Sequence, residues 1–305
     1  MKIVVVNKKS DFSDEQIKNL ENLGDLVFIE NSEDFKSTEE FYTPEEKIIA
    51  LDPGISEWNF TNQTIDKIPN LKAICLPTTR YEWVDGGYLR KKGIVLTNVP
   101  KYSTESVAEH CILLMLSLSK KLPMIINEGW KLNYEKHLGR EIEGSKMGVI
   151  GLGDIGKRVL ELGRAMGMKV SYWSRKSRDS RFEYKDLDEL IQSSNYIFLT
   201  ISDGPETKNF FSKKKIDLMK KGSYAINISG DGVWDFDYLR QRVRGDQLAG
   251  IALDDDKRHM SDLKSNILIT PHIAWYTEEA FKEDYRIWVE CIDSVAKGTP
   301  INVVN

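Results

Sequence analysis

The fold is decided by residues 144–175, which read G-S-K-M-G-V-I-G-L-G-D-I-G-K-R-V-L-E-L-G-R-A-M-G-M-K-V-S-Y-W-S-R. Residues 146–150 and 169–173 are short apolar runs of the kind that form buried strands. Between them, apolar residues recur at the spacing of one helical face: Ile155, Val159, Leu162 and Met166. The stretch therefore predicts strand, turn, helix and strand, which is the repeating unit of a parallel sheet.

The turn after the first strand carries the pattern G-x-G-x-x-G. Gly151 permits a tight turn, Gly153 lets the backbone approach a pyrophosphate, and Gly156 lets the helix pack close to the strand. Asp154 and Ile155 begin that helix, where free N–H groups and the positive end of the dipole face the phosphates. We predict a dinucleotide site at these five residues; the alternative is a fold that no longer binds nucleotide.

The end of the second strand indicates which dinucleotide binds. An NAD site usually has Asp or Glu about twenty residues beyond the turn, where it accepts from the ribose 2′-hydroxyl. This chain has Ser174, Arg175 and Lys176 there instead. Because a guanidinium and a hydroxyl bind a 2′-phosphate that a carboxylate would repel, the sequence favours NADP(H), with NAD(H) possible. The alternative is a solvated basic loop.

The composition is that of a globular protein, with 41% hydrophobic and 30% charged residues among 305. A net charge of -4 argues against a nucleic acid or an anionic membrane as partner. The longest apolar stretch, 107–118, is too short to span a bilayer. The cysteines are few, widely spaced and without a metal-site pattern: Cys75, Cys111 and Cys291. We therefore expect a cytoplasmic protein without a metal.

Strands alternate with helices along most of the chain, which predicts two doubly wound parallel sheets. The strands expected in the first domain are residues 3–6, 26–29, 48–51, 71–76 and 94–97. After residue 173 we expect further strands at residues 196–200, 223–228, 248–253 and 267–269. Helices are expected between them at residues 186–193, 213–219 and 235–243. A last helix, residues 277–297, should return to cover the first domain.

A long helix is expected from Ser103 onward, with Glu105 and Ser106 supplying N-terminal capping chemistry. Its apolar residues cover more than one stripe, so it should be buried on several sides. His110 on this helix is interpreted as a packed or hydrogen-bonded structural histidine.

The chain resembles the D-isomer-specific 2-hydroxyacid dehydrogenase family over nearly its full length. The resemblance is carried by N-V-P-K-Y-S-T-E-S-V-A-E-H (98–110), G-V-I-G-L-G-D-I-G (148–156), P-E-T (205–207), I-N-I-S (226–229), A-G-I-A-L-D (249–254) and T-P-H-I-A (270–274). It implies a Rossmann cofactor domain, residues 99–274, inserted into a flavodoxin-like substrate domain, residues 1–98 plus 275–305. It also implies a homodimer that acts on a small-molecule substrate.

The resemblance also implies roles for single residues. In the family, the histidine of T-P-H donates a proton to the substrate carbonyl while the nicotinamide delivers hydride, and His272 matches it. The remaining cofactor contacts that the resemblance implies lie on or beside the same stretches: Ser202, Thr207, Ile228, Ser229, Asp254, His272 and Ala274.

Two of the three catalytic side chains of the family do not match. Gly230 stands where the family has the arginine that binds the substrate carboxylate, and His259 where it has the glutamate that pairs with the histidine. An arginine–carboxylate hydrogen bond contributes about 1.5–3 kcal/mol, and Asp231 would repel a carboxylate as well. We therefore expect a carbonyl substrate other than an ordinary small 2-oxo acid.

A cation from the substrate domain offers one replacement. The family's substrate loop resembles residues 78–85, where Arg80 takes a glycine position and Tyr81 follows it. Lys101 and Tyr102 complete the predicted substrate-binding set, and the aromatic rings favour a larger, less polar substrate. The alternative for Arg80 is that it points to solvent or pairs with Glu82.

Other features of the sequence leave the function open in part. The stretch 202–204 reads Ser-Asp-Gly where the family has Pro-Leu-Thr, and Asp255 and Asp256 are expected in a solvated loop. The prediction is an NADP(H)-dependent oxidoreductase that uses His272 as acid and base. The alternatives are an enzyme that uses the cofactor for non-redox or transient redox chemistry, and a non-catalytic dimer that senses nucleotide.

Overall fold

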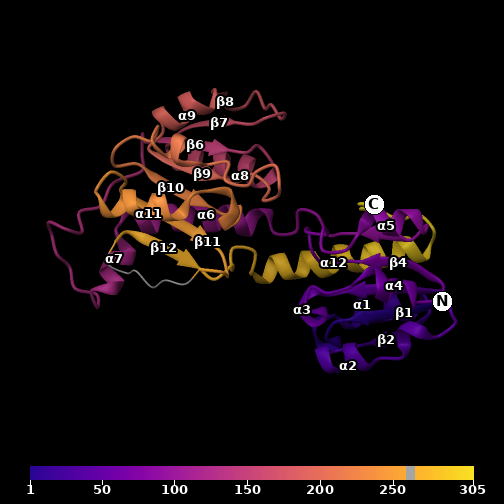
Figure 1. The fold of residues 1–305 in the computed structure, drawn as a ribbon. Coiled ribbons are helices and arrows are strands. Elements are labelled where there is room, and N and C mark those ends of the chain that lie inside the picture. Colours follow the sequence, from indigo (N-terminus) through magenta and orange to yellow (C-terminus); the bar gives the residue numbers. More distant parts are fainter. Residues whose placement is uncertain (259–264) are drawn as a thin grey trace. The chain divides into compact units, whose positions relative to one another are not determined.

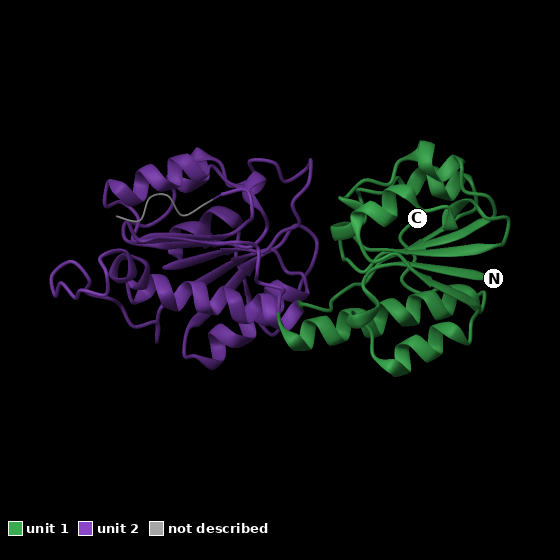
Figure 2. Ribbon diagram, turned by 90° about the horizontal axis from the view of Figure 1, so that it is seen from below, with its two compact units in different colours: residues 1–103, 277–305 green, residues 104–276 purple. Residues whose placement is uncertain are grey.

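The computed structural model of the protein describes residues 1–258 and 265–305. The chain divides into two compact units (Figure 2): unit 1 comprises Met1–Ser103 with Thr277–Asn305, and unit 2 comprises Thr104–Tyr276. His259, which stands in place of the family's glutamate, lies outside the described residues. Within the described ranges, no helix is both long and apolar enough to cross a membrane.

The sheet of unit 1 has the strand order β2-β1-β3-β4-β5, and every pairing in it is parallel. Its strands are β1 (Lys2–Val6), β2 (Asp25–Phe28), β3 (Lys47–Leu51), β4 (Leu71–Cys75) and β5 (Val95–Thr97). All of these strands were expected from the sequence. The order is that of a flavodoxin-like sheet, and it reverses between β1 and β3.

Helices cover both faces of this sheet. They are η1 (Lys9–Asp11), α1 (Asp14–Glu21), α2 (Ser32–Ser37), η2 (Glu40–Tyr42), α3 (Pro53–Ser56), α4 (Asn62–Asp66), α5 (Gly86–Lys91) and α12 (Glu278–Ala296). α12, from the end of the chain, packs with α1 on one face, where Trp288 is fully buried against Ile48 and Ala73. The indole N–H of Trp288 donates to the carbonyl oxygen of Cys75 at 2.9 Å.

The sheet of unit 2 has the strand order β12-β11-β10-β9-β6-β7-β8, again with parallel pairing throughout (Figure 1). Its strands are β6 (Lys146–Ile150), β7 (Lys169–Trp173), β8 (Glu183–Tyr184), β9 (Tyr196–Leu199), β10 (Tyr224–Asn227), β11 (Gly250–Asp254) and β12 (Ile267–Thr270). Each strand was expected except β8, which is too short to leave a periodic signal. The prediction of two parallel-sheet α/β domains is confirmed.

The helices of unit 2 are α6 (Thr104–Ser119), α7 (Leu122–Asn127), α8 (Asp154–Ala165), α9 (Leu187–Ser193), α10 (Lys213–Ile216), η3 (Asp231–Val233) and α11 (Phe236–Arg244). α6 and α8 pack together on one face of the sheet, and α9, α10 and α11 on the other. α10 ends earlier than the sequence suggested. α6 is buried on several sides, as its apolar pattern predicted.

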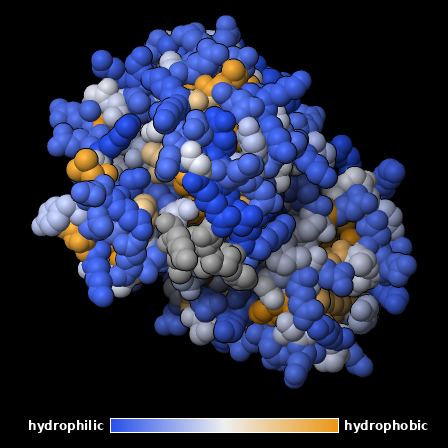
Figure 3. Space-filling view, turned by 60° about the vertical axis from the view of Figure 1, so that its left-hand side comes forward, coloured by the Kyte–Doolittle hydropathy of each residue, from blue (hydrophilic) through white to orange (hydrophobic). Residues whose placement is uncertain are grey.

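The face of the protein shown in Figure 3 is dominated by polar and charged residues, with only small orange areas of apolar side chains. This agrees with the composition. The large apolar side chains that are exposed elsewhere are therefore candidates for a contact surface.

Candidate active site

The glycine turn between β6 and α8 is built without room for side chains. Gly151 has a φ of 112°, and a Cβ there would lie 2.8 Å from the carbonyl carbon of Thr200. A Cβ on Gly156 would lie 2.0 Å from the carbonyl oxygen of Gly151. At Gly153, by contrast, a Cβ would meet no described atom within 4 Å. The turn is thus closed toward the protein and open at Gly153, which is where a ligand phosphate can approach the backbone.

A pocket of about 350 Å³ opens beside this turn. Its lining brings together the ends of β6, β7 and β9: Gly151, Leu152, Gly153, Trp173, Ser174, Arg175, Lys176, Ser177, Thr200, Ile201, Ser202, Thr207 and Phe210. The rings of Trp173 and Phe210 stack with centroids 5.5 Å apart. The pocket therefore offers apolar rings, open backbone and basic side chains together, which are the contacts that a nucleotide needs.

The basic loop after β7 is held by its own contacts. Ser174 is buried, and its hydroxyl accepts from the N–H of Ser177. The Arg178 guanidinium donates to the carbonyl oxygens of Ser174 and Ser177, both at 2.9 Å, and lies over the ring of Tyr184. Arg175 extends into an exposed ion pair with Glu206, 2.8 Å away. Because exposed pairs contribute little, a ligand phosphate can compete for Arg175.

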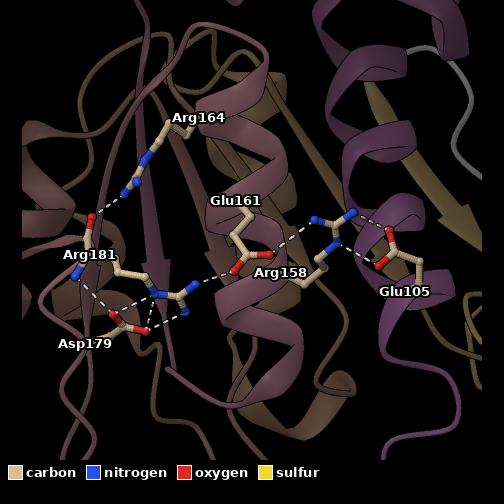
Figure 4. A network of polar contacts seen from close by, with 6 residues as sticks. All are labelled: Glu105, Arg158, Glu161, Arg164, Asp179 and Arg181. Carbon is tan, nitrogen blue, oxygen red and sulfur yellow. Dashed lines mark hydrogen bonds and ion pairs between the residues drawn. The ribbon is translucent and has the colours of Figure 1, made fainter.

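A network of ion pairs fastens the far end of this loop to the helices (Figure 4). Arg181 pairs with Asp179 at 2.7 Å and with Glu161 of α8 at 2.8 Å. Glu161 in turn binds Arg158, whose guanidinium makes two hydrogen bonds of 2.7 Å to Glu105 of α6. The network joins the loop after β7 to α8 and, through α8, to α6. Glu105 takes part in this network, a role that the capping interpretation missed.

A second group of predicted site residues lies at the ends of β10, β11 and β12, along the same edge of the sheet. Asp254, the last residue of β11, is its centre. The Asp254 carboxylate accepts from the Thr270 hydroxyl at 2.5 Å and from the backbone N–H groups of Ile273 and Ala274 at 3.0 and 2.9 Å. It thereby fixes the chain on both sides of His272.

His272 itself is exposed and has a φ of 52°. Its backbone N–H donates to the carbonyl oxygen of Thr270 at 2.9 Å. A left-handed conformation is costly for a residue with a side chain, and it persists where the surroundings enforce it. The hydrogen bonds of Asp254 supply that enforcement, so the imidazole is presented to solvent by a rigid turn.

Two residues of α6 brace the same turn; His110 was interpreted from the sequence as a packed or hydrogen-bonded structural histidine, whereas Ser106 was given a capping role. The Ser106 hydroxyl donates to the carbonyl oxygen of Ala274 at 2.6 Å, and His110 Nε2 lies 3.0 Å from the Thr270 hydroxyl. The spacing of four residues on one helix face was the available signal. Since Thr270 donates its single proton to Asp254, it must accept from His110, which fixes the Nε2–H tautomer. Burial lowers the pKa of His110, although the charge of Asp254 opposes this, so the ring is held neutral.

A side chain at Gly230, where the sequence predicts that the family arginine is missing, would be strained. Gly230 has a φ of 106°, and a Cβ there would lie 2.8 Å from Oδ2 of Asp203, whose carboxylate would have to shift. Asp203 belongs to the stretch 202–204, which is also predicted to depart from the family pattern. Ile228 and Ser229, predicted to contact the cofactor, follow β10 just before this point, and the Ser229 hydroxyl donates to the carbonyl oxygen of Leu199.

Of the two acidic residues expected in a solvated loop, Asp256 is exposed and Asp255 is buried. Asp231 pairs with Arg258 at 2.6 Å, and this hydrogen bond raises the pKa of Arg258. Asp255 is buried and accepts from the backbone N–H groups of Asp231 and Lys257. The expectation of a solvated loop is wrong for Asp255, and the charge of Asp231 is balanced by a cation that sequence reasoning did not single out.

The predicted substrate-binding residues lie in unit 1. Arg80 and Tyr81 are in the loop after β4, and Lys101 and Tyr102 are in the segment after β5. Arg80 and Lys101 are exposed, and Lys101 has a φ of 66°. Burial raises the pKa of Tyr102. Their role toward a substrate stays a prediction.

Replacing Asp254 tests its hold on the His272 turn. In Asp254→Asn, an amide N–H₂ must face a hydrogen-bond donor, so we expect a loss of about 1.5–3 kcal/mol in the free energy of unfolding. Urea unfolding measures it. Asp256→Asn, an exposed change in the same loop, is the matched control and should leave stability unchanged. Equal stability of the two variants would contradict the role given to Asp254.

Comparisons with known proteins agree with this arrangement. Residues 112–274 match the family model of the D-isomer specific 2-hydroxyacid dehydrogenase, NAD binding domain. The hydroxypyruvate reductase of Blautia hydrogenotrophica is 29% identical over the whole of both chains. Among solved structures, an acyclic imino acid reductase in complex with NADPH and D-Arg is 27% identical over the whole of both chains, with a TM-score of 0.83.

A D-lactate dehydrogenase from Aquifex aeolicus, complexed with NAD and lactic acid, is 28% identical, with a TM-score of 0.78 over 98% of this chain and 96% of that one. The similar structures thus include one with NAD and one with NADPH, and the matching names are those of dehydrogenases and reductases. The chain is an NAD(P)-dependent oxidoreductase, and it belongs to the D-isomer-specific 2-hydroxyacid dehydrogenase family.

Proposed function

We propose that the protein is an NADP(H)-dependent oxidoreductase that acts on a carbonyl group, with His272 as proton donor and acceptor. The observation that carries the proposal is the pocket in which the glycine turn meets Ser174, Arg175 and Lys176. No carboxylate lines this pocket among the described residues, so a 2′-phosphate would meet a hydroxyl and two cations.

The residues present fit a nicotinamide dinucleotide. The open backbone at Gly153 and the start of α8 would hold the pyrophosphate, and the basic loop would hold the phosphorylated ribose. Ser202 and Thr207 border the pocket on its β9 side, where the Thr207 hydroxyl donates to the carbonyl oxygen of Ser202 at 2.6 Å. When bound, the nicotinamide supplies or accepts the hydride.

His272 would hold the proton that the reaction needs. An imidazole is suited to proton transfer in either direction near neutral pH. Its turn is fixed by Asp254 and Ser106, so the ring can be aimed without movement of the backbone. This is a positioning effect of the protein, and it does not require the glutamate that the family places at position 259.

The conformation of Gly230 argues for an unusual substrate. A substrate carboxylate would find no arginine at residue 230, and Arg258 nearby is already bound to Asp231. A C=N group is a second candidate for the reacting bond, because the acidic side chain of Asp203 lies beside Gly230.

Turnover of NADPH with a panel of carbonyl compounds tests the reaction. We expect slow or no oxidation of NADPH with glyoxylate, pyruvate and hydroxypyruvate, and turnover with carbonyl or imine substrates that lack a free carboxylate at the reacting end. His272→Gln should lower kcat by about 10²–10⁴-fold while NADPH still binds. If NADPH binds tightly but is oxidised with none of the compounds, the proposal is contradicted. Transient redox chemistry or nucleotide sensing would then be favoured.

The cofactor preference is tested at Arg175. Removing a charge-assisted contact of about 1.5–3 kcal/mol should weaken NADPH binding by about 10–100-fold in Arg175→Ala, with NADH binding unchanged. Fluorescence titration of the bound nicotinamide measures both constants. Lys208→Ala removes an exposed cation outside the pocket and serves as the control. A parallel loss for NADH and NADPH would contradict a 2′-phosphate site.

We also propose a homodimer, formed through the segment after α6. Large apolar side chains are exposed along this segment: Ile126, Trp130, Leu132, Tyr134 and Leu138. Three of them are more than two-thirds exposed, at 70%, 84% and 78% for Trp130, Tyr134 and Leu138. Monomers rarely leave such side chains in water, so a second copy of the chain is the proposed cover.

The free, buried thiols Cys75, Cys111 and Cys291 support a location in the cytoplasm.

Charged substitutions in this segment should separate the dimer. We expect the double variant Trp130→Asp, Leu138→Asp to have half the mass of the native protein in analytical ultracentrifugation, because a buried unpaired carboxylate is costly. Tyr42→Asp, at an exposed aromatic residue of unit 1, should keep the native mass. A monomeric native protein, or a dimeric double variant, would contradict the proposed interface.

A further inference from the structure

Polar residues gather at the switch point of the sheet of unit 1. In an open parallel sheet, ligands bind outside the carboxyl ends of the strands where the strand order reverses. Here the order reverses between β1 and β3. Asn7 directly follows β1 and Asp52 directly follows β3. Unit 1 therefore carries polar groups at the place where this class of fold binds ligands, and the function proposed above does not use them.

α12 adds two side chains at this point. The Tyr285 hydroxyl accepts from Asn7 Nδ2 at 3.0 Å and lies 3.4 Å from Asp11 Oδ2. One turn further along α12, Trp288 donates to Cys75, the last residue of β4. Asp284 immediately precedes Tyr285, on a helix fastened to the ends of β1 and β4. Those two strands flank β3, and α12 also contacts β3, so Asp284 lies near the strand end that carries Asp52.

Asp284 is the unusual member of this group. It is 6% exposed, and its Oδ1 has no hydrogen-bond partner among the described residues. Burial raises the pKa of Asp284, and the charge of Asp52 raises it further, to about 8. A buried carboxyl oxygen without a hydrogen-bond partner is costly. A bound cation would satisfy this oxygen once the group has released its proton.

The Asp52 carboxylate is held in place. Its Oδ1 accepts from the N–H groups of Gly54 and Ile55, at 2.7 and 3.3 Å, which caps α3. Burial raises the pKa of Asp52 as well, and the charge of Asp11 adds to this. The cap fixes the carboxylate while leaving its second oxygen at the switch point.

We propose that Asp52 and Asp284 form a binding site for a protonated amine at the switch point of unit 1. A metal ion is a poorer occupant, since no group of three or more His, Cys, Asp or Glu suited to a metal occurs in the described part of the chain. A protonated amine needs only two or three acceptors, which a pair of carboxylates provides.

This site would determine which substrates the proposed enzyme accepts, and the inference rests on the function proposed above. If the enzyme reduces a carbonyl group, the site selects substrates that carry a protonated amine away from the reacting carbon. Such a substrate is held by its positive charge, so it does not need the arginine that Gly230 replaces.

Binding at this site is coupled to a proton. Asp52, Tyr102 and Tyr285 face Asp284, and Asp11 acts on Asp52 and Tyr285. Below its raised pKa, Asp284 carries a proton that it must release to hold an ammonium ion. The affinity for an amine therefore rises with pH up to about 8, by at most about tenfold per pH unit.

Calorimetric titration of the full chain with methylammonium chloride tests the site. It is run at pH 6 and pH 8 in two buffers of different ionisation heat, which reports the released proton. The variants are Asp284→Asn and Asp52→Asn; the second keeps a good helix cap, because Asn and Asp cap equally well. Asp293→Asn makes the same change at a partly exposed residue of α12 and is the control. Equal concentrations of KCl and MgCl₂ replace methylammonium in separate titrations.

We expect saturable binding to the native protein and to Asp293→Asn, tighter at pH 8 than at pH 6, with proton release. Binding should weaken at least about tenfold in either site variant, as a lost charge-assisted contact implies. The proposal is overturned if no saturable binding occurs, if KCl or MgCl₂ binds as well as methylammonium, or if the control loses binding as the site variants do.

Turnover separates this inference from the function on which it rests. NADPH oxidation is compared for aminoacetone and for butanone, a neutral ketone of similar size. Preference for aminoacetone that is lost in Asp52→Asn supports the site as a substrate site. Equal turnover of both ketones in all variants overturns the inference and leaves the reductase intact. Methylammonium binding without turnover of either ketone keeps the cation site and removes the proposed reductase.

Discussion

The approach of α8 to the end of β6 is the contact on which unit 2 depends. A Cβ on Gly156 would lie 2.0 Å from the Gly151 carbonyl oxygen, so only glycine at this position lets the first turn of α8 pack this close to the end of β6. Thr200, at the end of β9, donates its hydroxyl to the same carbonyl at 2.9 Å. The first turn of α8, the open backbone at Gly153 and the pocket beside it all follow from this one approach.

All strands of the two sheets except β8 could be predicted from the sequence. Buried parallel strands are short apolar runs, and these runs are easily recognised when they alternate with helices. β1 and β3 are entirely buried and were found with nearly their full extent. β8 was missed because two exposed residues, Glu183 and Tyr184, have no periodicity. The short helices α2 to α5 were missed for a related reason, since their caps precede too few residues to show a helical repeat: Asn31, Asp52, Thr61 and Asp85.

The candidate site was predictable as a set of positions and not as a set of contacts. Arg175 and His272 stand at places that motifs define. Ser106 and Arg258 act across 168 and 27 residues, on Ala274 and Asp231 respectively. Such contacts depend on how a helix and two loops pack, which no local pattern records. The same holds for Asp255, whose burial follows from the backbone N–H groups that surround its carboxylate and not from its neighbours in sequence.

The residues around Gly230 also make it difficult to restore the carboxylate-binding arginine of the family by substitution. An arginine at position 230 would be strained at a backbone φ of 106°, and the Asp203 carboxylate would have to shift to make room for it. Arg258, the guanidinium that the structure does bring to Asp231, is already paired. A substrate carboxylate would have to compete with Asp231 for it, whereas a neutral or positively charged substrate would meet no such competitor. For the proposed function, this competition favours a substrate that does not depend on a carboxylate contact in unit 2.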